Sequence, residues 1–459
     1  MGVSIDRQES SATGPARRGW AQGIQLAVIM VLGVVFVALT LYHLVFKDES
    51  LIDAQRLSAL RDQDLASKRQ ASADWPQWRG PNRDGVSTAK EKLTAWPESG
   101  PPRLWEQPVG KGYGTLAVAA GRAYLLMQDG PNESVVCWDA RTGTELWRFS
   151  YLADYRNAYG DGPRATPSVD GDRVYTVGAT GVMLCLKTHP KTPQGEQVWR
   201  HDLLAEFGAA NLTWGVSFSP LVANGLVYIN PGGRGGNSMA AVDKLTGKLR
   251  WSAGDDQAGY SSPVLATIAG RPQVVFFTAA GLVGVTPDTG AILWRFPWET
   301  SYGANVATPI IAGDYVFISS GYNRGCAVVH IEVSGDELVA RRVYENKNMR
   351  NHFSSSVLYK DHVYGCNEAL LTCLEFRTGI VKWKQRGFEK GSLLIADGRL
   401  VILGEDGKLG LAAATPAGYH LQATFQVADG RCWSVPALAN GLLYVRAESK
   451  VLCFDLRIK

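Results

Sequence analysis

Hydrophobic and polar residues alternate in short runs along most of the chain, and each run spans about five to seven residues. Alternation with a period of two residues is typical of β-strands that bury one face. Turns rich in glycine separate the runs, and glycine supplies the positive φ that a tight hairpin needs. With 50 Gly in 459 residues, the pattern predicts an all-β body with many hairpins.

One sequence unit recurs along this body. It opens with Ser/Thr-Pro and an apolar strand, continues through two further strands to a Thr-Gly turn, and ends at a Trp, as in residues 219–251 and 261–294. A four-stranded sheet cannot bury both of its faces alone, whereas sheets stacked around an axis bury each face against a neighbour. The repeat therefore predicts an eight-bladed β-propeller with four-stranded antiparallel blades. The units begin near residues 115, 165, 218, 261, 307, 354, 391 and 433.

The last unit has three strands and lacks the strand that carries the Trp. The missing strand has a counterpart before the first unit, where residues 103–106 read Arg-Leu-Trp-Glu. We therefore expect the N-terminal strand to complete the last blade and close the ring. The fifth and seventh units also lack the Trp, at residues 334–344 and 415–425.

A single apolar segment precedes the body. Residues 23–46 contain no Asp, Glu, Lys or Arg and, at roughly 35 Å as a helix, could span a bilayer. Arg17 and Arg18 lie just before the segment, so the positive-inside rule puts the N-terminus in the cytoplasm and the body in the periplasm. We expect a single-pass inner-membrane protein with four parts. These are a disordered cytoplasmic tail (1–22), a transmembrane anchor (23–46), a charged spacer (47–73) and the propeller (74–459).

The motif Asp-x-x-Thr-Gly-x-x-x-Trp occurs at Asp139–Trp147 and at Asp243–Trp251, and residues 74–87 read DWPQWRGPNRDGVS. With these motifs the chain resembles the PQQ-like, quinoprotein-type β-propeller repeat family over residues 74–459. That family includes quinoprotein alcohol dehydrogenases and BamB-like outer-membrane assembly lipoproteins. The resemblance implies that the repeated Trp residues pack between blades. These are Trp105, Trp147, Trp199, Trp251, Trp294 and Trp383. Trp75, Trp78 and Trp96 lie outside the repeat, and we expect them to fasten the leading segment to the propeller.

The loops that lead into the innermost strands should converge on one mouth of the channel. Aromatic side chains with a few converging polar groups are typical of a ligand site. We therefore expect this mouth to bind a small molecule or a peptide. The alternative is that these groups only hydrogen-bond neighbouring blades and fill the channel. The candidate residues are Tyr113, Arg164, Trp214, Asp255, Asp256, Tyr260, Tyr302, Asn305, Asn351, His352, Lys390 and Trp433.

Some candidates suit particular ligands. Asp255, Asp256 and Asn305 carry the hard oxygen atoms that Ca²⁺ prefers. Arg164 and Lys390 could pair with carboxylates, and Trp214 and Trp433 could stack on a planar ring. A tricarboxylate quinone such as PQQ, bound with Ca²⁺, would need these features.

Other sequence features weigh against redox chemistry. The seven cysteines are scattered, without the CxxCH motif that attaches haem and without an adjacent pair. An adjacent Cys pair is what the resemblance would imply for a quinoprotein alcohol dehydrogenase, and this chain lacks one. The seven His form no metal-binding cluster, and we assign no catalytic residue.

The leading hypothesis is a periplasmic binding or scaffolding propeller without enzymatic activity, held at the membrane and bound to an envelope protein. A PQQ-dependent quinoprotein oxidoreductase, acting on alcohols or sugars, is the alternative. A solute sensor is a third hypothesis, which the short cytoplasmic tail disfavours. The net charge of +4 and the lack of a basic run give no reason to propose nucleic acid as a partner.

Overall fold

The computed structural model describes residues 73–89 and 92–457. The chain divides into two units, Met1–Leu65, which lies outside the described residues, and Ala66–Lys459, which holds the propeller. The expected tail and anchor, and the spacer as far as residue 72, thus lie outside the described part. Within that part, no helix has the length and apolar character needed to cross a membrane.

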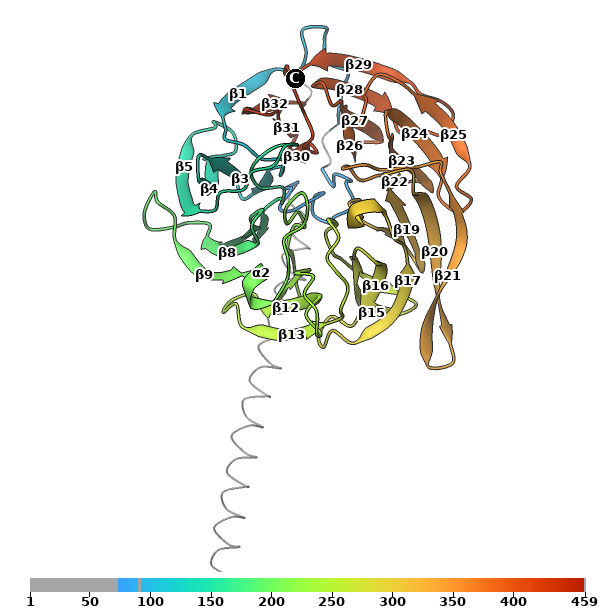
Figure 1. The fold of residues 1–459 in the computed structure, drawn as a ribbon. Coiled ribbons are helices and arrows are strands. Elements are labelled where there is room, and N and C mark those ends of the chain that lie inside the picture. The colour runs from blue at the N-terminus through green and yellow to red at the C-terminus, as the bar shows by residue number, and fades with distance from the viewer. Residues whose placement is uncertain (1–72, 90–91, 458–459) are drawn as a thin grey trace, which may run out of the picture. The chain divides into compact units, whose positions relative to one another are not determined.

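Eight four-stranded antiparallel sheets surround a central axis, so the predicted eight-bladed propeller is confirmed (Figure 1). Seven blades are consecutive in sequence. Blade 1 holds β2 (Ala117–Ala119), β3 (Arg122–Asp129), β4 (Asn132–Asp139) and β5 (Glu145–Leu152). Blade 2 holds β6 (Ser168–Asp170), β7 (Arg173–Val177), β8 (Val182–Lys187) and β9 (Gln197–Asp202). Blade 3 holds β10 (Leu221–Ala223), β11 (Leu226–Ile229), β12 (Met239–Asp243) and β13 (Leu249–Ala253). Blade 4 holds β14 (Val264–Ile268), β15 (Arg271–Phe277), β16 (Gly281–Val285) and β17 (Ile292–Pro297).

The remaining blades follow in the same order. Blade 5 holds β18 (Ile310–Ala312), β19 (Tyr315–Ser320), β20 (Gly325–Ser334) and β21 (Glu337–Asn346). Blade 6 holds β22 (Val357–Tyr359), β23 (His362–Asn367), β24 (Leu370–Glu375) and β25 (Val381–Gln385). Blade 7 holds β26 (Ser392–Ala396), β27 (Arg399–Leu403), β28 (Lys408–Ala413) and β29 (Leu421–Gln426). Blade 8 joins β1 (Arg103–Pro108) to β30 (Ala437–Ala439), β31 (Leu442–Arg446) and β32 (Lys450–Asp455). Two short helical turns, α2 (Leu203–Glu206) and η1 (Ser301–Gly303), lie in loops.

The ring closes where the first strand meets the last. Strand β1 pairs antiparallel with β32, with Trp105 opposite Cys453 and Gln107 opposite Val451. The Trp105 indole also donates to the carbonyl oxygen of Ala140 in blade 1, at 3.1 Å. This confirms the expectation that the N-terminal strand completes the last blade. Strand β1 pairs within blade 8 and also contacts blade 1, so it joins the last blade to the first.

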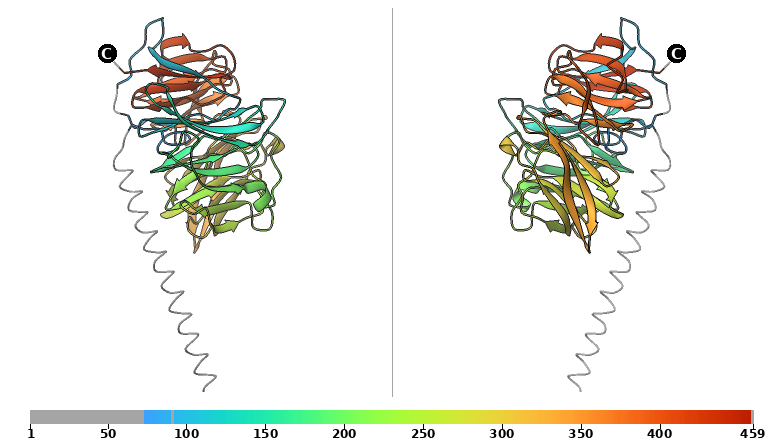
Figure 2. Two further views of the ribbon diagram at one scale, coloured as in Figure 1. Left: turned by 90° about the vertical axis from the view of Figure 1, so that its left-hand side faces the viewer. Right: turned by 90° about the vertical axis from the view of Figure 1, so that its right-hand side faces the viewer.

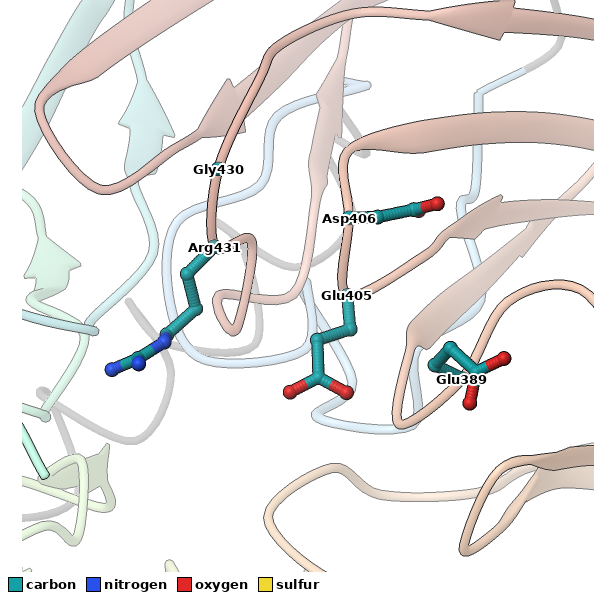
Figure 3. Close-up of a pocket in the computed structure, with 5 residues that line it drawn as sticks. All are labelled: Glu389, Glu405, Asp406, Gly430 and Arg431. Atoms are coloured by element: carbon teal, nitrogen blue, oxygen red, sulfur yellow. The ribbon is translucent and has the colours of Figure 1, made fainter.

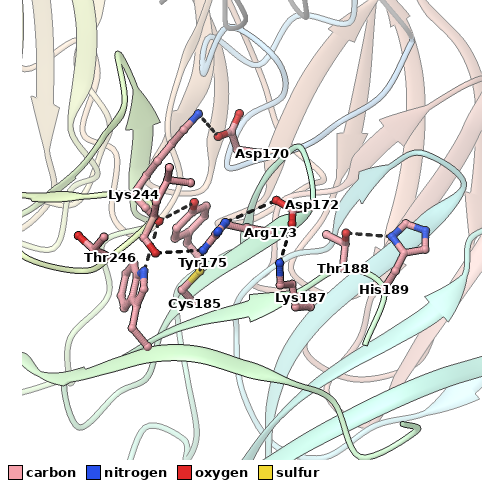
Figure 4. A network of polar contacts seen from close by, with 12 residues as sticks. Asp170, Asp172, Arg173, Tyr175, Cys185, Lys187, Thr188, His189, Lys244 and Thr246 are labelled. Atoms are coloured by element: carbon pink, nitrogen blue, oxygen red, sulfur yellow. Dashed lines mark hydrogen bonds and ion pairs between the residues drawn. The ribbon is translucent and has the colours of Figure 1, made fainter. Parts of the chain in front are cut away.

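At three junctions the Trp of one blade packs on the Thr-Gly turn of the next blade: Trp105 on Gly143, Trp199 on Gly247 and Trp251 on Gly290. At the junction of blades 2 and 3, the Trp199 indole donates to the Lys244 carbonyl oxygen at 3.2 Å and covers Gly247. The Tyr175 hydroxyl donates to the same carbonyl at 3.0 Å, and the Lys244 ammonium pairs with Asp170 at 2.7 Å (Figure 4). These contacts explain why Trp and Thr-Gly recur together, and they confirm the expected position of Trp199 between blades.

Blade 5 lacks this Trp, and Tyr344 takes its place. The Tyr344 hydroxyl donates to the Phe376 carbonyl oxygen at 3.1 Å, and its ring covers Gly379 in the turn of blade 6. The unit that looked degenerate in the sequence therefore makes the same kind of junction.

Ser and Thr hydroxyl groups at the start of several units lie around the channel, and we call this set the hydroxyl ring. The Thr166 hydroxyl accepts from the Thr115 amide at 3.2 Å, and the Ser219 hydroxyl accepts from the Thr166 amide at 2.9 Å. The Ser262 hydroxyl accepts from the Ser219 amide at 2.9 Å. Each bond joins neighbouring blades, so the recurring hydroxyl connects the segments that lead into the innermost strands of blades 1 to 4.

The leading segment, residues 73–89, fills the centre of the propeller, and we call it the plug. Its start is coloured blue in the side views of Figure 2. Trp75 is buried and pairs with Val118 of β2, and the Trp78 indole donates to the Thr308 hydroxyl at 2.8 Å. Trp96, further along the chain, packs against the same hydrophobic cluster as Trp75. These contacts confirm that the three Trp residues outside the repeat fasten the leading segment to the blades.

Candidate functional site

A band of aromatic side chains covers the mouth of the channel where the loops lead into the innermost strands. We call it the aromatic belt. Its members come from seven blades, and most of them belong to loops that precede strands β2, β6, β10, β14, β18, β22 and β30. They are Tyr113, Tyr159, Trp214, Tyr260, Tyr302, Tyr322, His352, Phe353 and Trp433.

Trp433 is the centre of one half of the belt. Its ring centroid lies 4.8 Å from that of Phe353 and 5.4 Å from that of Tyr113. The Arg431 guanidinium lies over the Trp433 ring at 4.2 Å, and it donates to the carbonyl oxygen of Tyr159 at 3.2 Å. Loops of blades 8, 6, 1 and 2 therefore meet at this point.

Trp214 is the centre of the other half. Its ring stacks on Tyr322, with centroids 6.0 Å apart and planes 18° apart, and it contacts Tyr260 at 5.5 Å and Tyr302 at 5.6 Å. Tyr322 in turn lies 5.0 Å from the His352 ring, and this contact connects the two halves. The belt is continuous because rings from neighbouring and next-neighbouring blades touch one after another.

Two members of the belt project far into solvent. Tyr159 is 64% exposed and Tyr302 is 68% exposed, although both contact other aromatic rings. Large exposed aromatic side chains that adjoin one another are typical of interaction surfaces. The belt is therefore the leading candidate for a binding surface on this face.

The backbone holds two aromatic residues of the belt, Tyr302 and Tyr322, in a strained conformation. Tyr302 has a φ of +63° and Tyr322 a φ of +51°, in the left-handed region that costs a residue with a Cβ about 1 kcal/mol or more. The buried amide of Asn305 supports the Tyr302 loop, because its nitrogen donates to the carbonyl oxygens of Thr278 (2.8 Å) and Trp298 (2.9 Å). Local strain that the surrounding structure maintains is common at functional surfaces.

Arg164 supports the belt from below. Its guanidinium donates to the carbonyl oxygens of Gly160 (2.6 Å) and Gly162, and it lies 4.6 Å from the Tyr155 ring and 5.5 Å from the Tyr113 ring. Burial lowers the pKa of Arg164, and the nearby Tyr155 partly opposes that effect. Its donors serve its own loop, so Arg164 shapes the mouth.

His352 contributes a titratable group to the belt. Burial lowers the pKa of His352, and the positive charge of Lys390 lowers it further. The Glu368 carboxylate, whose Oε2 lies 3.4 Å from Nδ1 of His352, acts in the opposite direction. The predicted residues His352 and Lys390 therefore lie near one another at the mouth.

The oxygen ligands expected for Ca²⁺ already have partners. Asp256 accepts from the Thr278 hydroxyl at 2.9 Å and pairs with Arg295 at 2.7 Å. The Asp255 carboxylate accepts from the Gly236 amide at 2.9 Å, and the Asn305 oxygen accepts from the Ser320 hydroxyl at 2.8 Å. These residues do not fit a Ca²⁺ site. More generally, the described ranges contain no group of three or more His, Cys, Asp or Glu placed to hold a metal ion.

The residues expected to hold PQQ do not fit a planar tricarboxylate either. Tyr322 covers a face of Trp214, while Phe353 and Arg431 pack against Trp433. Asn351 is fully buried, where its nitrogen donates to the Cys366 carbonyl oxygen and its oxygen accepts from the Ser356 hydroxyl. Asn351, like Asn305, therefore holds neighbouring segments together.

A shallow pocket of about 380 Å³ borders the belt beside blade 7 (Figure 3). Its lining residues are Glu389, Glu405, Asp406, Gly430 and Arg431. The Trp433 indole donates to the Glu405 carboxylate at 2.7 Å, so the pocket and the belt share a wall.

Sequence reasoning missed Tyr159, Tyr322, Phe353 and Arg431. Tyr322 lies in the hairpin between β19 and β20, the second and third strands of blade 5. That turn reaches the same face as the loop into the first strand, so Tyr322 joins the belt. The signal was present, since Tyr322 interrupts the turn sequence Ser-Gly-Tyr-Asn-Arg-Gly at residues 320–325. Tyr159 and Phe353 lie within loops already expected to line the mouth.

Comparisons with known proteins agree with this architecture. A family model described as outer membrane protein assembly factor BamB matches residues 131–385, which is more than half of the chain. The outer membrane protein assembly factor BamB of Burkholderia pseudomallei (strain K96243) is 28% identical over 200 residues, which cover 42% of this chain. The match spans 45% of that relative's length, less than half of it.

Two solved structures share the fold. The crystal structure of BamB from Moraxella catarrhalis has a TM-score of 0.51 and 13% identity, covering 76% of this chain and 98% of that one. The computationally designed Ika8 protein has a TM-score of 0.54 and 13% identity, covering 80% of this chain and 99% of that one. At such low identity the two structures support the fold alone. Since the family model extends from β4 of blade 1 to the end of blade 6, the chain belongs to the BamB family of PQQ-like β-propellers.

Proposed function

We propose that this chain is a binding or scaffolding protein of the cell envelope, and that its aromatic belt docks a protein partner. The observation that carries the proposal is the continuous belt from seven blades, with Tyr159 and Tyr302 projecting into solvent. Tyr and Trp dominate the binding energy of many protein interfaces, because they bury a large area with few rotatable bonds.

The form of the mouth favours a macromolecule over a small substrate. The rings of Trp214 and Trp433 pack against other belt side chains, so the belt closes the mouth as a broad surface. The polar groups beneath it, such as Arg164, bind carbonyl oxygens of their own loops. This arrangement offers apolar area to a partner and supports the scaffolding hypothesis over a PQQ-dependent oxidoreductase.

The partner we propose is an envelope protein that takes part in outer-membrane protein assembly. The printed name of the Burkholderia relative and the matched family model support this choice. The apolar segment 23–46 supports a single-pass inner-membrane anchor, with residues 1–22 in the cytoplasm and residues 47–73 as a periplasmic spacer. Ala73 accepts a hydrogen bond from Asn440, in the turn after β30, on the face opposite the belt.

Site-specific photocrosslinking in cells tests the docking surface. A photoreactive phenylalanine analogue replaces Tyr159 or Tyr302 in the full-length chain, and the adducts are identified by mass spectrometry. Ile380, which is 56% exposed in the turn before β25, is the matched control position. We expect the same envelope protein at positions 159 and 302, its loss in Trp214→Ala, and none of it at position 380. Equal capture at position 380 would contradict the proposal.

The oxidoreductase alternative has its own test. The full-length protein is incubated with PQQ and Ca²⁺, desalted, and measured for quinone absorbance and dye reduction with alcohols or sugars. We expect neither signal, because the proposed Ca²⁺ ligands are already paired. Retained quinone together with substrate-dependent dye reduction would establish the enzyme in place of the scaffold.

A further inference from the structure

The plug enters the channel from the face opposite the aromatic belt. Asp74 lies at that face, where its carboxylate accepts from the Ala120 amide at 3.0 Å and from the Asn440 side chain at 2.9 Å. Ala120 and Asn440 directly follow the innermost strands β2 and β30, whereas the belt loops precede such strands. The two ends of the channel are therefore covered by different parts of the chain.

The middle of the plug reaches the level of the hydroxyl ring. The Arg83 guanidinium donates to the carbonyl oxygens of Ser219 (2.9 Å) and Pro220 (3.1 Å) in blade 3. The Arg79 guanidinium donates to the Ser356 carbonyl oxygen at 2.7 Å in blade 6. Together with the bond from Trp78 to Thr308 in blade 5, these contacts fix the plug to three blades at the depth where the innermost strands begin.

The plug also pairs with the free edges of innermost strands. Trp75 and Val118 of β2 exchange two backbone hydrogen bonds, each 2.8 Å long. On blade 7, Ile395 of β26 donates to Gly85 at 2.9 Å and accepts from Ser87 at 2.7 Å. Both contacts are isolated bridges at either end of a segment that turns between them, and such backbone bonds to a sheet edge are also used in peptide recognition.

The two plug arginines are held in costly positions. Arg79 has a φ of +63° and Arg83 a φ of +58°, each in the left-handed region that costs about 1 kcal/mol or more for a residue with a Cβ. They are only 2% and 4% exposed, and burial lowers the pKa of Arg79 to about 10 and that of Arg83 to about 9. Glycine at either position would remove the backbone strain. The hydrogen bonds of the two guanidinium groups must therefore offset the strain that arginine causes.

Two glycines of the plug leave no room for a side chain. A Cβ on Gly80 would lie 2.9 Å from the Trp75 ring, and a Cβ on Gly85 would lie 2.8 Å from Val357 of β22. Both glycines also have positive φ, +83° and +80°. Gly80 thus lets the plug pack against its own Trp75, whereas the channel itself contacts Gly85, two indoles and two guanidinium groups.

We propose that the central channel is a peptide-binding site whose ligand is the segment of residues 73–89 of this chain. The non-covalent contacts of this segment hold it in the channel without the peptide connection to β1, and an added copy of the same segment competes for the site. The site lies on the opposite face from the belt, so this inference is independent of the proposed docking function.

Cutting the chain after folding tests this site. A protease site is inserted after Ala89 in the full-length protein, which carries an N-terminal affinity tag and is purified in detergent. After cleavage, we expect the propeller to stay on the affinity resin with the plug. Excess synthetic peptide of residues 73–89 should release it, whereas a scrambled peptide should not. Near-UV circular dichroism follows the fold throughout.

Variants assign the retention to named contacts. Trp78→Phe removes the bond to Thr308 but keeps an aromatic ring, and we expect release about fivefold faster than in the unmutated plug. Arg83→Ala removes three hydrogen bonds and should accelerate release further. Trp214→Ala in the belt should leave the release rate unchanged. If Arg83→Ala fails to fold, Trp78→Phe decides alone.

Three results would overturn the inference. The first is immediate release of a natively folded propeller on cleavage. The second is equal displacement by the scrambled peptide. The third is a release rate in Trp78→Phe equal to that of the unmutated plug.

Discussion

The benzene ring of Trp251 lies against Gly290 in the next blade, where a Cβ on residue 290 would be 2.3 Å from the ring. The Trp251 indole also donates to the Pro287 carbonyl oxygen at 2.8 Å, in the same turn. The same relationship joins Trp199 to Gly247 one blade earlier. The Trp of each such pair thus requires the glycine of the following unit.

Gly290→Ala should therefore destabilise the propeller by about 3 kcal/mol or more. The new Cβ strains the backbone at a positive φ, and it also forces the Trp251 ring to move. Gly270→Ala is the matched control, since Gly270 has the same φ of +71° but nothing within 4 Å of its Cβ position. We expect about 1 kcal/mol for that variant. Urea unfolding measures both, and equal losses would show that the Trp contact does not constrain the turn.

Ser219→Ala should cost about 1–3 kcal/mol in the free energy of unfolding, because the buried Thr166 amide loses its hydroxyl acceptor. Ser217→Ala, in the same loop, removes a hydroxyl that donates only to the Gly215 carbonyl oxygen. We expect a smaller loss there. Chemical denaturation compares the two, and a larger loss in Ser217→Ala would contradict a role for the hydroxyl ring in joining blades.

The buried carboxyl of Glu133 should make stability depend on pH. Burial raises the pKa of Glu133 above 4.5, although the Tyr151 hydroxyl at 2.6 Å and the Ala179 amide at 2.9 Å oppose the shift. The folded protein then binds more protons than the unfolded chain, so this group lowers stability as pH rises above about 4.5. In Glu133→Gln this dependence should disappear in urea titrations at several pH values. An unchanged pH profile would rule out this carboxyl as its source.

The charges around His352 should shift its pKa in opposite directions. Lys390→Met removes a positive charge and should raise the pKa of His352, whereas Glu368→Gln removes a negative charge and should lower it. NMR titration of the imidazole signals in histidine-labelled protein measures both. Shifts of the same sign in the two variants would show that these charges do not act on His352.

The blades and the ring closure could be predicted because their signals are local and repeated. Each unit carries its own Thr-Gly turn and apolar strands, so eight copies reinforce one interpretation. The role of Tyr344 was harder to predict. A Tyr that does not follow a Thr-Gly turn gives no sign that it ends a unit, although the hydroxyl of Tyr344 reaches the Phe376 carbonyl oxygen.

The chemistry of the mouth was harder to predict. Asp256 suggested a metal ligand, but its partner Arg295 lies 39 residues away on β17, and the loop sequence carries no sign of this pair. The buried arginines of the plug were missed for another reason. Arginine is rarely fully buried, and nothing in the leading segment marks Arg79 and Arg83 as an exception.

The pairing of β1 with β32 also bears on how the protein is made. Glu106 and Lys450, which pair across these strands, are 344 residues apart. A ribosome releases β1 long before β32, so blade 8 cannot be assembled until β32 has been made. The exposed edge of β1 needs protection during that interval, and joining such distant segments makes maturation slow. A helper that shields unpaired strands would therefore matter most for the earliest part of the propeller to emerge.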